Sequence, residues 1–552
     1  MARRRDLLKV LSAGAMNAVL PSVRQAAPAA TPRPGQPNII FILSDQHRAG
    51  LTKLSGYPLD TSPTLDSLAE NGVSFDKAYV TCPVCAPSRI SVLTGRWPEA
   101  HRQRQNTEHL AAYYEKDLFD VLKAAGYKTG LAGKNHTYMK STKLDFWREY
   151  GHQGGWEAPN APPEIKGFDA WMQRLNSGVS YEPTPFPVST ESPYRIVSDA
   201  IEFMQRFGDQ PFALEVSFPE PHNPEQVPKP YWDMYPPDSV PDRCAGPEVL
   251  KYKGYKMQWL YGMENDAHPI YEKQWRRYKT NYLGMLRLLD DQLKRLVDFM
   301  RQQNLLEKTI IVYMADHGDY LMDFGLGRKG AGLPECLTRV PMVWSGWGIQ
   351  AGHPHHPACV SNADVMPTLC EAIGVEIPYG MQGRSLWPLL QGKDYPEEEF
   401  RSIYAGVGFG GLYYDESYPM PYRLAEFPPK GSSGKGPPTA LWNIDELNPV
   451  TQSGTMKMVR MGDWKLIYDM MGYGQLYNLA SDPCELKNLF GDSSVAAEQL
   501  RMVEELLMWT IRCQDTLPAD EPMKGWQSTR WSQKHNWYAP YRHGKAPEPF
   551  IP

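Results

Sequence analysis

The clearest structural signal in the chain is Asn38-Ile-Ile-Phe-Ile-Leu43, an apolar run that changes abruptly to Ser44-Asp45-Gln46. A short run rich in apolar and β-branched residues predicts a strand buried on both faces, which is typical of a parallel sheet covered by helices. Further runs of this kind predict strands at 129–132, 212–218, 309–314 and 340–344.

Helical patterns alternate with these runs. Segments 63–71, 118–125, 196–207 and 363–373 are each followed by glycine, a common residue at helix C-termini. The longest expected helix covers about 279–303, where Met285, Leu289, Leu293, Leu296 and Met300 form one apolar stripe that we expect to pack in the core. Strands alternating with helices predict an α/β fold, with a mostly parallel sheet sandwiched by helices.

A different pattern begins near residue 400. Segments 455–461 and 464–468 alternate around Gly462-Asp463 and predict a hairpin, and a strand at 475–479 and a helix at about 495–513 follow. We therefore expect an α/β domain over 36–400 and a C-terminal subdomain over 401–552, with a smaller antiparallel sheet, a helix and an aromatic-rich tail. Segment 419–439 is rich in Pro, Gly and Ser and predicts a surface loop.

Composition excludes several classes of protein. The 552 residues are 42% hydrophobic and 22% charged, values typical of globular chains and not of disordered or coiled-coil proteins. The formal net charge is −5, so there is no basic footprint for nucleic acid. No apolar run reaches the length of a transmembrane helix, and no transmembrane segment is expected.

The first 30 residues resemble a targeting segment. Arg3-Arg-Arg-Asp-Leu-Leu-Lys9 is followed by a short apolar stretch over 10–20 and by Ala27-Pro-Ala-Ala30. This order predicts a twin-arginine export signal over 1–30, and hence a periplasmic or secreted protein. The alternative interpretation is a basic tail.

The eight cysteines are not expected to form a disulfide framework, because a chain of this size needs none. Cys82 and Cys85 form a C-x-x-C pair, a spacing typical of redox pairs or of half a zinc site. A zinc site would need a second pair of ligands at similar spacing, which the sequence lacks. His353, His355 and His356 lie among prolines and are expected in an exposed loop.

Polar side chains that can act as acids, bases or metal ligands follow four of the expected strands. They are Asp45, Gln46, Lys134, His136, His222, Asp316 and His317. In open α/β sheets, ligands bind outside the carboxyl ends of the strands. These residues therefore predict one active site at that edge of the sheet.

The segment Cys85-Ala86-Pro87-Ser88-Arg89, with Leu93-Thr94-Gly95-Arg96 after it, resembles the C-x-P-S-R signature of type I sulfatases, members of the alkaline-phosphatase-like superfamily. Further family features occur in order along the chain: Pro37-Asn38 leading to Asp45, Gly133-Lys134-x-His136, Pro221-His222, Asp316-His317-Gly318 with Lys329, and Leu476-Tyr477-Asn478-Leu479 with Asp482-Pro483, Glu485 and Asn488-Leu489. The resemblance implies an alkaline-phosphatase-like fold and oxidation of Cys85 to formylglycine by a formylglycine-generating maturase.

The resemblance also implies roles for the site residues. A hydrated aldehyde at residue 85 carries two hydroxyls: one attacks sulfur, and the other later expels sulfate as the aldehyde re-forms. Arg89 and Lys134 would hold that hydrate, and His136 would assist the collapse. His222 and Lys329 would contact the sulfate and the leaving oxygen, with His222 as the best candidate for the general acid.

A divalent metal is implied by Asp45, Gln46, Asp316, His317 and the modified residue 85. Many family members carry Asp-Asp and Asp-Asn where this chain has Asp45-Gln46 and Asp316-His317. Ca²⁺ is the first expectation, and the imidazole shifts the balance towards Mn²⁺. The variation resembles the choline-sulfatase and phosphonate-monoesterase branch, which also places a polar pocket residue at Asn106. An Asn in a loop is also an ordinary turn former.

Three functions remain open on this basis. The first is hydrolysis of a sulfate monoester, of a sulfated carbohydrate or of a small molecule such as choline sulfate. The second is hydrolysis of a phosphonate or phosphate ester, whose tetrahedral centre has the same shape. The third is non-catalytic carbohydrate binding through Trp526, Trp531 and Trp537, although tryptophans are more often buried.

Overall fold

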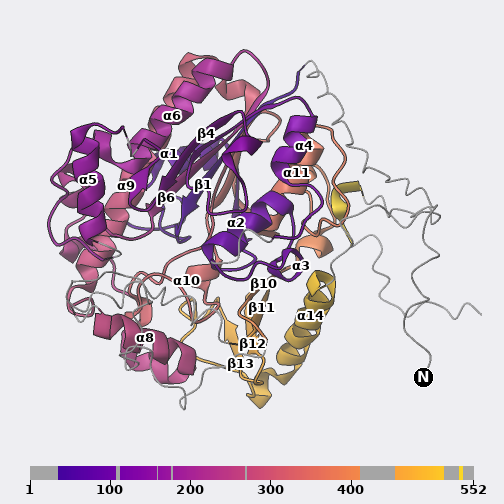
Figure 1. The fold of residues 1–552 in the computed structure, drawn as a ribbon. Helices are drawn as coiled ribbons and strands as arrows, with labels where there is room; N and C mark the ends of the chain where they lie inside the picture. The colour runs from indigo at the N-terminus through magenta and orange to yellow at the C-terminus, as the bar shows by residue number, and fades with distance from the viewer. Residues whose placement is uncertain are drawn as a thin grey trace, which may run out of the picture.

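The computed structural model describes residues 35–106, 112–157, 160–175, 178–267, 270–410, 454–514 and 534–538. Within these residues the chain forms a nine-stranded sheet and a four-stranded sheet (Figure 1). The expected export signal over 1–30, the loop at 419–439, and Trp526 and Trp531 lie outside the described residues. No helix in the described ranges is both long and apolar enough to cross a bilayer.

The large sheet has the order β5-β4-β3-β6-β1-β7-β8-β2-β9. Its strands are β1 (Asn38–Asp45), β2 (Gly72–Tyr79), β3 (Lys128–Gly133), β4 (Phe146–Gly151), β5 (Gly154–Gly155), β6 (Phe212–Pro221), β7 (Thr309–Ala315), β8 (Met342–Gly346) and β9 (His353–Ser361). The run from β4 to β7 is parallel, β8 is antiparallel to both neighbours, and β2 and β9 pair in parallel. The predicted mostly parallel sheet is confirmed.

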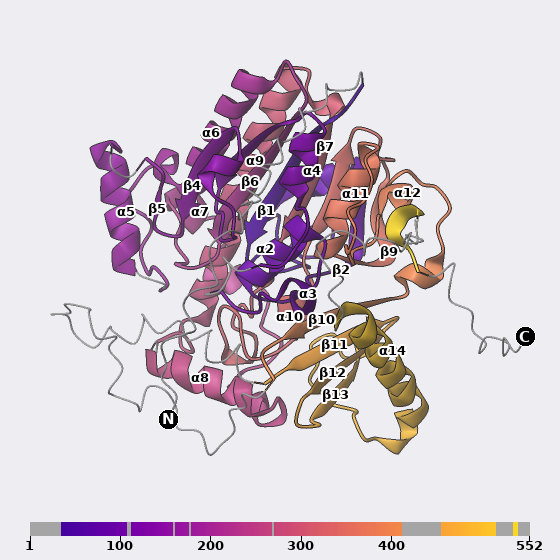
Figure 2. The same cartoon turned by 45° about the vertical axis from the view of Figure 1, so that its right-hand side comes forward.

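Helices cover both faces of this sheet (Figures 1 and 2). Ile40 and Ile42 of β1 pack into the cluster that contains α1 (Pro63–Glu70), α6 (Ser192–Phe207) and α9 (Trp275–Gln302). Their neighbours Ile39 and Phe41 pack on the other face. That face is covered by α2 (Cys85–Thr94), α4 (Leu118–Ala124) and α11 (Val365–Ala372). Because side chains alternate along a strand, one apolar run supplies both cores.

Shorter or peripheral helices complete this part of the chain: α3 (Pro98–His101), α5 (Pro163–Leu175), α7 (Lys229–Trp232), α8 (Tyr255–Ala267), α10 (Glu335–Thr338) and α12 (Trp387–Leu390). The small sheet is antiparallel and contains β10 (Ser402–Val407), β11 (Met456–Met461), β12 (Trp464–Asp469) and β13 (Gly474–Asn478). Its apolar side packs against α14 (Ala496–Gln514). The predicted hairpin and final helix are confirmed.

Three local expectations are wrong. Gly72 does not cap α1 but begins β2, where a Cβ would lie 2.1 Å from the carbonyl oxygen of Trp344 on β8, so the glycine permits close strand approach. His353, His355 and His356 lie in strand β9 and not in a loop. β9 is an edge strand, and an edge position tolerates the prolines that suggested irregular structure.

The third correction concerns the cysteines. Cys244 and Cys484 form a disulfide across 240 residues of sequence. It joins the segment that precedes α8 to the segment that follows β13. The other six cysteines, including Cys82 and Cys85, are free and buried. Trp537 is 6% exposed and donates a hydrogen bond to the carbonyl of Ser385, which agrees with the interpretation of that tryptophan as a core residue.

Candidate active site

Four adjacent parallel strands bring the predicted site residues to one edge of the large sheet. In the order β3, β6, β1 and β7, their carboxyl ends lead to Lys134, His222, Asp45 and Asp316. The order along the sheet differs from the order along the chain, so residues 45 and 316 become neighbours. A hydrogen bond links the ends of β1 and β7: the backbone N–H of Gln46 donates to Asp316 Oδ1 at 3.0 Å.

Cys85 lies at the N-terminus of α2, against the edge formed by the strands. Its sulfur lies 3.7 Å from Asp45 Oδ1 and 3.2 Å from His317 Nε2. The preceding residue, Val84, supplies no side-chain cap to the helix. Instead, Asn106 Oδ1 accepts a hydrogen bond from the backbone N–H of Ala86 at 3.1 Å. Asn106 thus holds the first turn of α2, a contact that the sequence interpretation as a substrate-pocket residue did not anticipate.

Asn362 fixes α2 from a second direction. Its amide donates to the carbonyl and to the hydroxyl of Ser88 at 3.0 and 2.8 Å. Its side-chain oxygen accepts from the backbone N–H of Thr81 at 3.0 Å. The helix that presents Cys85 is therefore held by the half-buried amide of Asn106 and the buried amide of Asn362, which orient residue 85 before any substrate binds.

Arg89 is committed to neighbouring groups of the protein. Its guanidinium is 2.7 Å from Asp316 Oδ2 and 3.5 Å from Asp45 Oδ2. It also donates to Ser217 Oγ at 2.7 Å and to the carbonyl of Lys134 at 3.1 Å. A buried arginine with this many partners acts as a rigid brace for both carboxylates and for the Lys134 segment.

Asp45, Cys85, Asp316 and His317 offer ligand atoms that all lie within 4.8 Å of one another. All four side chains are buried. Burial and the adjacent Asp45 charge raise the pKa of Asp316. Burial by itself would lower the pKa of His317, but the neighbouring Asp316 carboxylate raises it above its ordinary value. Two carboxylates and an imidazole that converge in this way fit a divalent cation, which would relieve the repulsion between the carboxylates.

Gln46 lies beside this cluster with its amide orientation set by two partners. Its Nε2 donates to Asp319 Oδ2 at 2.5 Å, and its Oε1 accepts from Lys329 Nζ at 3.0 Å. The backbone φ of Gln46 is 72°, in the left-handed region that non-glycine residues rarely adopt. Such backbone conformations concentrate at functional sites, where surrounding contacts hold them.

The cations of the site act on Cys85. Burial and the Asp45 carboxylate would raise the pKa of the Cys85 thiol, but Lys134, Lys329 and His317 together hold it well below its usual range. Lys134 also forms an ion pair with Asp45. The opposing charges keep the pKa of the Asp45 carboxyl well below its ordinary value despite burial. The environment therefore stabilises negative charge at position 85 and at any oxygen that replaces the sulfur.

Three histidines lie at the more open side of the site. His136, His152 and His222 are half-buried, whereas Cys85, Asp45 and Asp316 are buried. His222 Nδ1 lies 2.8 Å from the backbone carbonyl of Asn223, so Nδ1 carries the hydrogen and Nε2 remains for other partners. Burial and Lys134 lower the pKa of His136, against a hydrogen bond to Cys85 that raises it.

Sequence reasoning missed four residues that shape this site: His152, Ser217, Asp319 and Asn362. Ser217 lies on β6, inside a predicted strand, and Asp319 follows Asp316-His317-Gly318 by one residue. His152 occupies the turn between β4 and β5, in the glycine-rich segment Gly151-His152-Gln153-Gly154-Gly155. The glycines of that segment predict a turn, but no motif in it predicts that the turn lies at the active site.

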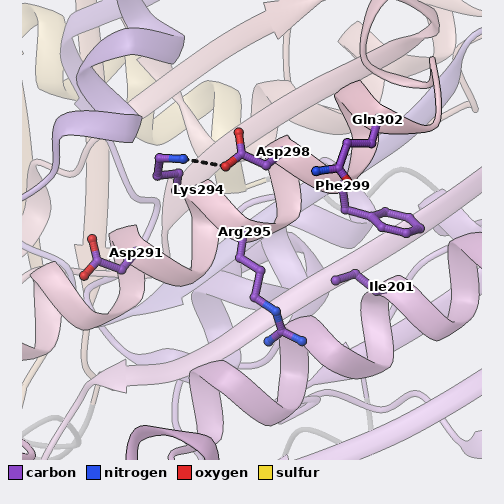
Figure 3. A pocket seen from close by; sticks show the side chains of 7 residues that line it. All are labelled: Ile201, Asp291, Lys294, Arg295, Asp298, Phe299 and Gln302. Carbon is purple, nitrogen blue, oxygen red and sulfur yellow. Dashed lines mark hydrogen bonds and ion pairs between the residues drawn. The ribbon is translucent and has the colours of Figure 1, made fainter.

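A separate hollow on the surface carries no comparable chemistry. It lies over α6 and α9 and is lined by Ile201, Asp291, Lys294, Arg295, Asp298, Phe299 and Gln302 (Figure 3). Lys294 pairs with Asp298 at 2.5 Å one helical turn away, and Arg295 donates to Ser198 Oγ at 2.8 Å. These are ordinary contacts of helix surfaces. The hollow shares no residue with the Cys85 cluster.

Comparison with known proteins identifies the family. The family model described as Sulfatase matches residues 37–375, more than half of the chain. The choline-sulfatase of Rhizobium meliloti is 25% identical over 475 residues, which cover 82% of each chain. The ulvan-active sulfatase of Formosa agariphila is 29% identical over 407 residues, which cover 71% of each.

Among solved structures, the phosphonate monoester hydrolase of Agrobacterium radiobacter superposes with a TM-score of 0.69 at 21% identity, over 87% of this chain and 96% of the other. At that identity the likeness shows a shared fold. The chain belongs to the sulfatase family and has its alkaline-phosphatase-like architecture. It is a sulfuric ester hydrolase.

Proposed function

We propose that this enzyme hydrolyses a sulfate monoester of a carbohydrate, with residue 85 matured to formylglycine and a divalent cation held by Asp45, Gln46, Asp316 and His317. One observation carries the proposal. Cys85 begins a braced helix and faces a buried cluster of two carboxylates and an imidazole, with Lys134 and Lys329 close enough to depress its pKa. Lys134 and Lys329, together with a cation held by the two carboxylates, would neutralise both the anionic ester and the nucleophilic oxygen.

Maturation of Cys85 would supply a hydrated aldehyde, whose hydroxyl is the nucleophile towards sulfur. In the structure the sulfur stands in for the oxygens of that group. The positive charges of Lys134 and Lys329 would then stabilise negative charge on the oxygens at residue 85 and on the sulfate. Arg89 keeps Asp45 and Asp316 in place, because its guanidinium forms an ion pair with Asp45 and hydrogen bonds to Asp316, to Ser217 and to the Lys134 carbonyl.

His222 is the group we assign to protonate the leaving oxygen. Its Nε2 is left available by the Nδ1 contact with Asn223, and its ring is at the more open side of the site. Burial, together with the charge of Lys329, holds the pKa of His222 well below its ordinary value in the free enzyme. A bound sulfate ester is anionic and favours the protonated ring, so the acid gains its proton when substrate enters.

The carbohydrate assignment is supported by the relatives, because one that covers 71% of this chain is described as active on ulvan. Choline sulfate is the alternative sulfate ester, in view of the relative described as a choline-sulfatase. A phosphonate ester is the second candidate, supported by the shared fold of the phosphonate monoester hydrolase. The imidazole of His317 makes Mn²⁺ a competitor of Ca²⁺ at the metal site.

We also propose export of the protein, on the basis of its N-terminal segment. The Cys244–Cys484 disulfide supports this proposal, since disulfides persist in oxidising compartments outside the cytosol. The residue ranges 36–400 and 401–552 are proposed as the catalytic domain and the C-terminal subdomain.

The test is a rate comparison with matured enzyme on a panel of sulfated sugars, choline sulfate, phenyl phosphonate and 4-nitrophenyl sulfate. The highest kcat/KM is expected on a sulfated sugar. A higher value on choline sulfate would correct the organic part alone, and a higher value on phenyl phosphonate would overturn the assignment of sulfur as the preferred centre. Mass spectrometry of the peptide that contains residue 85 establishes the maturation state in the same sample.

A further inference from the structure

His152 enters the active site from a position with no recognisable motif. β4 runs parallel to β3, and the antiparallel pairing of Gly151 with Gly154 makes His152 and Gln153 a two-residue hairpin turn between β4 and β5. Because β3 and β4 are parallel neighbours, this turn lies at the same carboxyl edge as Lys134. The side chain of His152 therefore reaches the site from the end of the next strand along the sheet.

Two contacts define the position of the His152 ring. Its Nε2 lies 2.8 Å from Lys134 Nζ. Its face stacks on the ring of His222, with centroids 3.8 Å apart and an interplanar angle of 24°. His152 thus bridges the lysine at the end of β3 and the histidine at the end of β6.

The hydrogen-bond partners assign the tautomer of each ring. Lys134 is an ammonium paired with Asp45 and has donors only, so His152 Nε2 must accept and carries no hydrogen. The ring proton of neutral His152 is then on Nδ1, a buried atom for which the described residues offer no hydrogen-bond partner. His222 has the corresponding proton on Nδ1, directed at the Asn223 carbonyl.

This arrangement has a consequence for His222. Its ring is held at one edge by the Asn223 carbonyl and on one face by the His152 ring, which together restrict both its position and its plane. A neutral ring can lie against a protonated His222, whereas a second imidazolium would repel it and Lys134 as well. The bond to Lys134 keeps His152 in the neutral form that this contact requires.

We propose that His152 is a positioning residue that holds His222 Nε2 towards the leaving oxygen of the sulfate ester. The inference rests on the proposed role of His222 as the acid. In the step concerned, the bond between sulfur and the leaving oxygen breaks, and that oxygen takes the proton from His222 Nε2. His152 forms no covalent bond and neither gains nor loses a proton.

The experiment uses the full-length, matured enzyme and three substitutions that separate the two contacts. His152→Ala removes both contacts, His152→Phe keeps a flat ring for stacking, and His152→Gln keeps an acceptor for Lys134. Gln153→Ala, in the same turn, is the matched control. Values of kcat/KM are measured on a series of aryl sulfates of increasing leaving-group pKa and on the best sugar sulfate.

His152→Ala is expected to lose about 10- to 100-fold on the poorest leaving groups, the same order as the loss when a group that orients a metal-ligating histidine is removed. The loss should shrink towards unity on the best leaving group, because that substrate needs little protonation. His152→Phe should recover most of the rate, and Gln153→Ala should match the unsubstituted enzyme. A loss of equal size on every leaving group would overturn the proposal, as would recovery by His152→Gln and not by His152→Phe.

A double-mutant cycle with His222→Ala separates this proposal from the one on which it rests. If His152 acts through His222, adding His152→Ala to His222→Ala should change kcat/KM by less than about twofold. Additive losses would assign His152 a separate role and refute the positioning. Losses from His222→Ala that do not depend on the leaving group would overturn the acid assignment and the His152 proposal together. Thermal unfolding of each variant identifies any that misfold, and His152→Phe then supplies the comparison.

Discussion

Replacement of His222 by alanine tests the central chemical assignment. The side chain makes one hydrogen bond to a backbone carbonyl, at 2.8 Å, and stacks on one neighbouring ring. Loss of a neutral hydrogen bond costs about 0.5–1.5 kcal/mol of stability, so the variant should remain folded. The expected effect is therefore on the reaction and not on the fold.

A positioned general acid contributes about 10²–10⁴ to a rate, which corresponds to about 2.7–5.5 kcal/mol of transition-state free energy. We expect His222→Ala to lose this factor on a sugar sulfate, whose alcohol leaves poorly without a proton. On 4-nitrophenyl sulfate the loss should be much smaller, since nitrophenolate is a stable leaving group. His222→Gln should behave as His222→Ala does, because an amide can donate a hydrogen bond but cannot act as the acid.

The assay is steady-state kcat/KM on both substrates with enzyme of equal metal content and equal maturation at residue 85. His355→Ala is the control: this histidine is exposed on β9, pairs only with Asp76 at 2.9 Å among the described residues, and should leave both rates unchanged. Equal losses on both substrates would refute the reasoning and move the acid role elsewhere, with Lys329 as the next candidate.

Three further predictions concern the same site and its support. A peptide that spans residue 85 should be lighter than its cysteine form by the exchange of thiol for aldehyde, and Cys85→Ala should be inactive. Mass spectrometry on the assayed sample measures the modification at residue 85. Full activity of a sample in which residue 85 is an unmodified thiol would contradict the proposed nucleophile. Asp316→Ala should lose metal and activity together, whereas His317→Asn should keep activity and shift the metal preference from Mn²⁺ towards Ca²⁺. Metal analysis of each variant and assays after chelator treatment check this prediction. Activity that is unchanged by a chelator and by Asp316→Ala would exclude a required metal. Burial raises the pKa of Glu215 from 4.5 to about 8, against the opposing charge of Arg89. The folded chain then binds a proton that the unfolded chain releases, so the free energy of unfolding should fall as pH rises from about 4.5 to 8, and Glu215→Gln should flatten this slope in denaturant titrations; an unchanged slope would show that Glu215 does not titrate as described.

Much of the site was predictable because ligands bind outside the carboxyl ends of the strands in parallel sheets. Each buried strand is visible in the sequence as an apolar run, and the polar residue after that run lies at the edge of the sheet where ligands bind. Asp45, Lys134, His222 and Asp316 follow such runs, and the structure brings all four to that edge. The order of motifs along the chain also determined the family, which the match over residues 37–375 shows.

The remaining features depend on contacts between segments distant in sequence. Strand β4 has a mixed polar composition, and only its pairing with β3 makes it a strand, so the turn that carries His152 had no visible place in the site. The Cys244–Cys484 disulfide joins residues 240 positions apart, and no spacing rule identifies such a pair. Local residue patterns determine which strands and helices form, whereas tertiary packing alone decides which turn lies against which strand end.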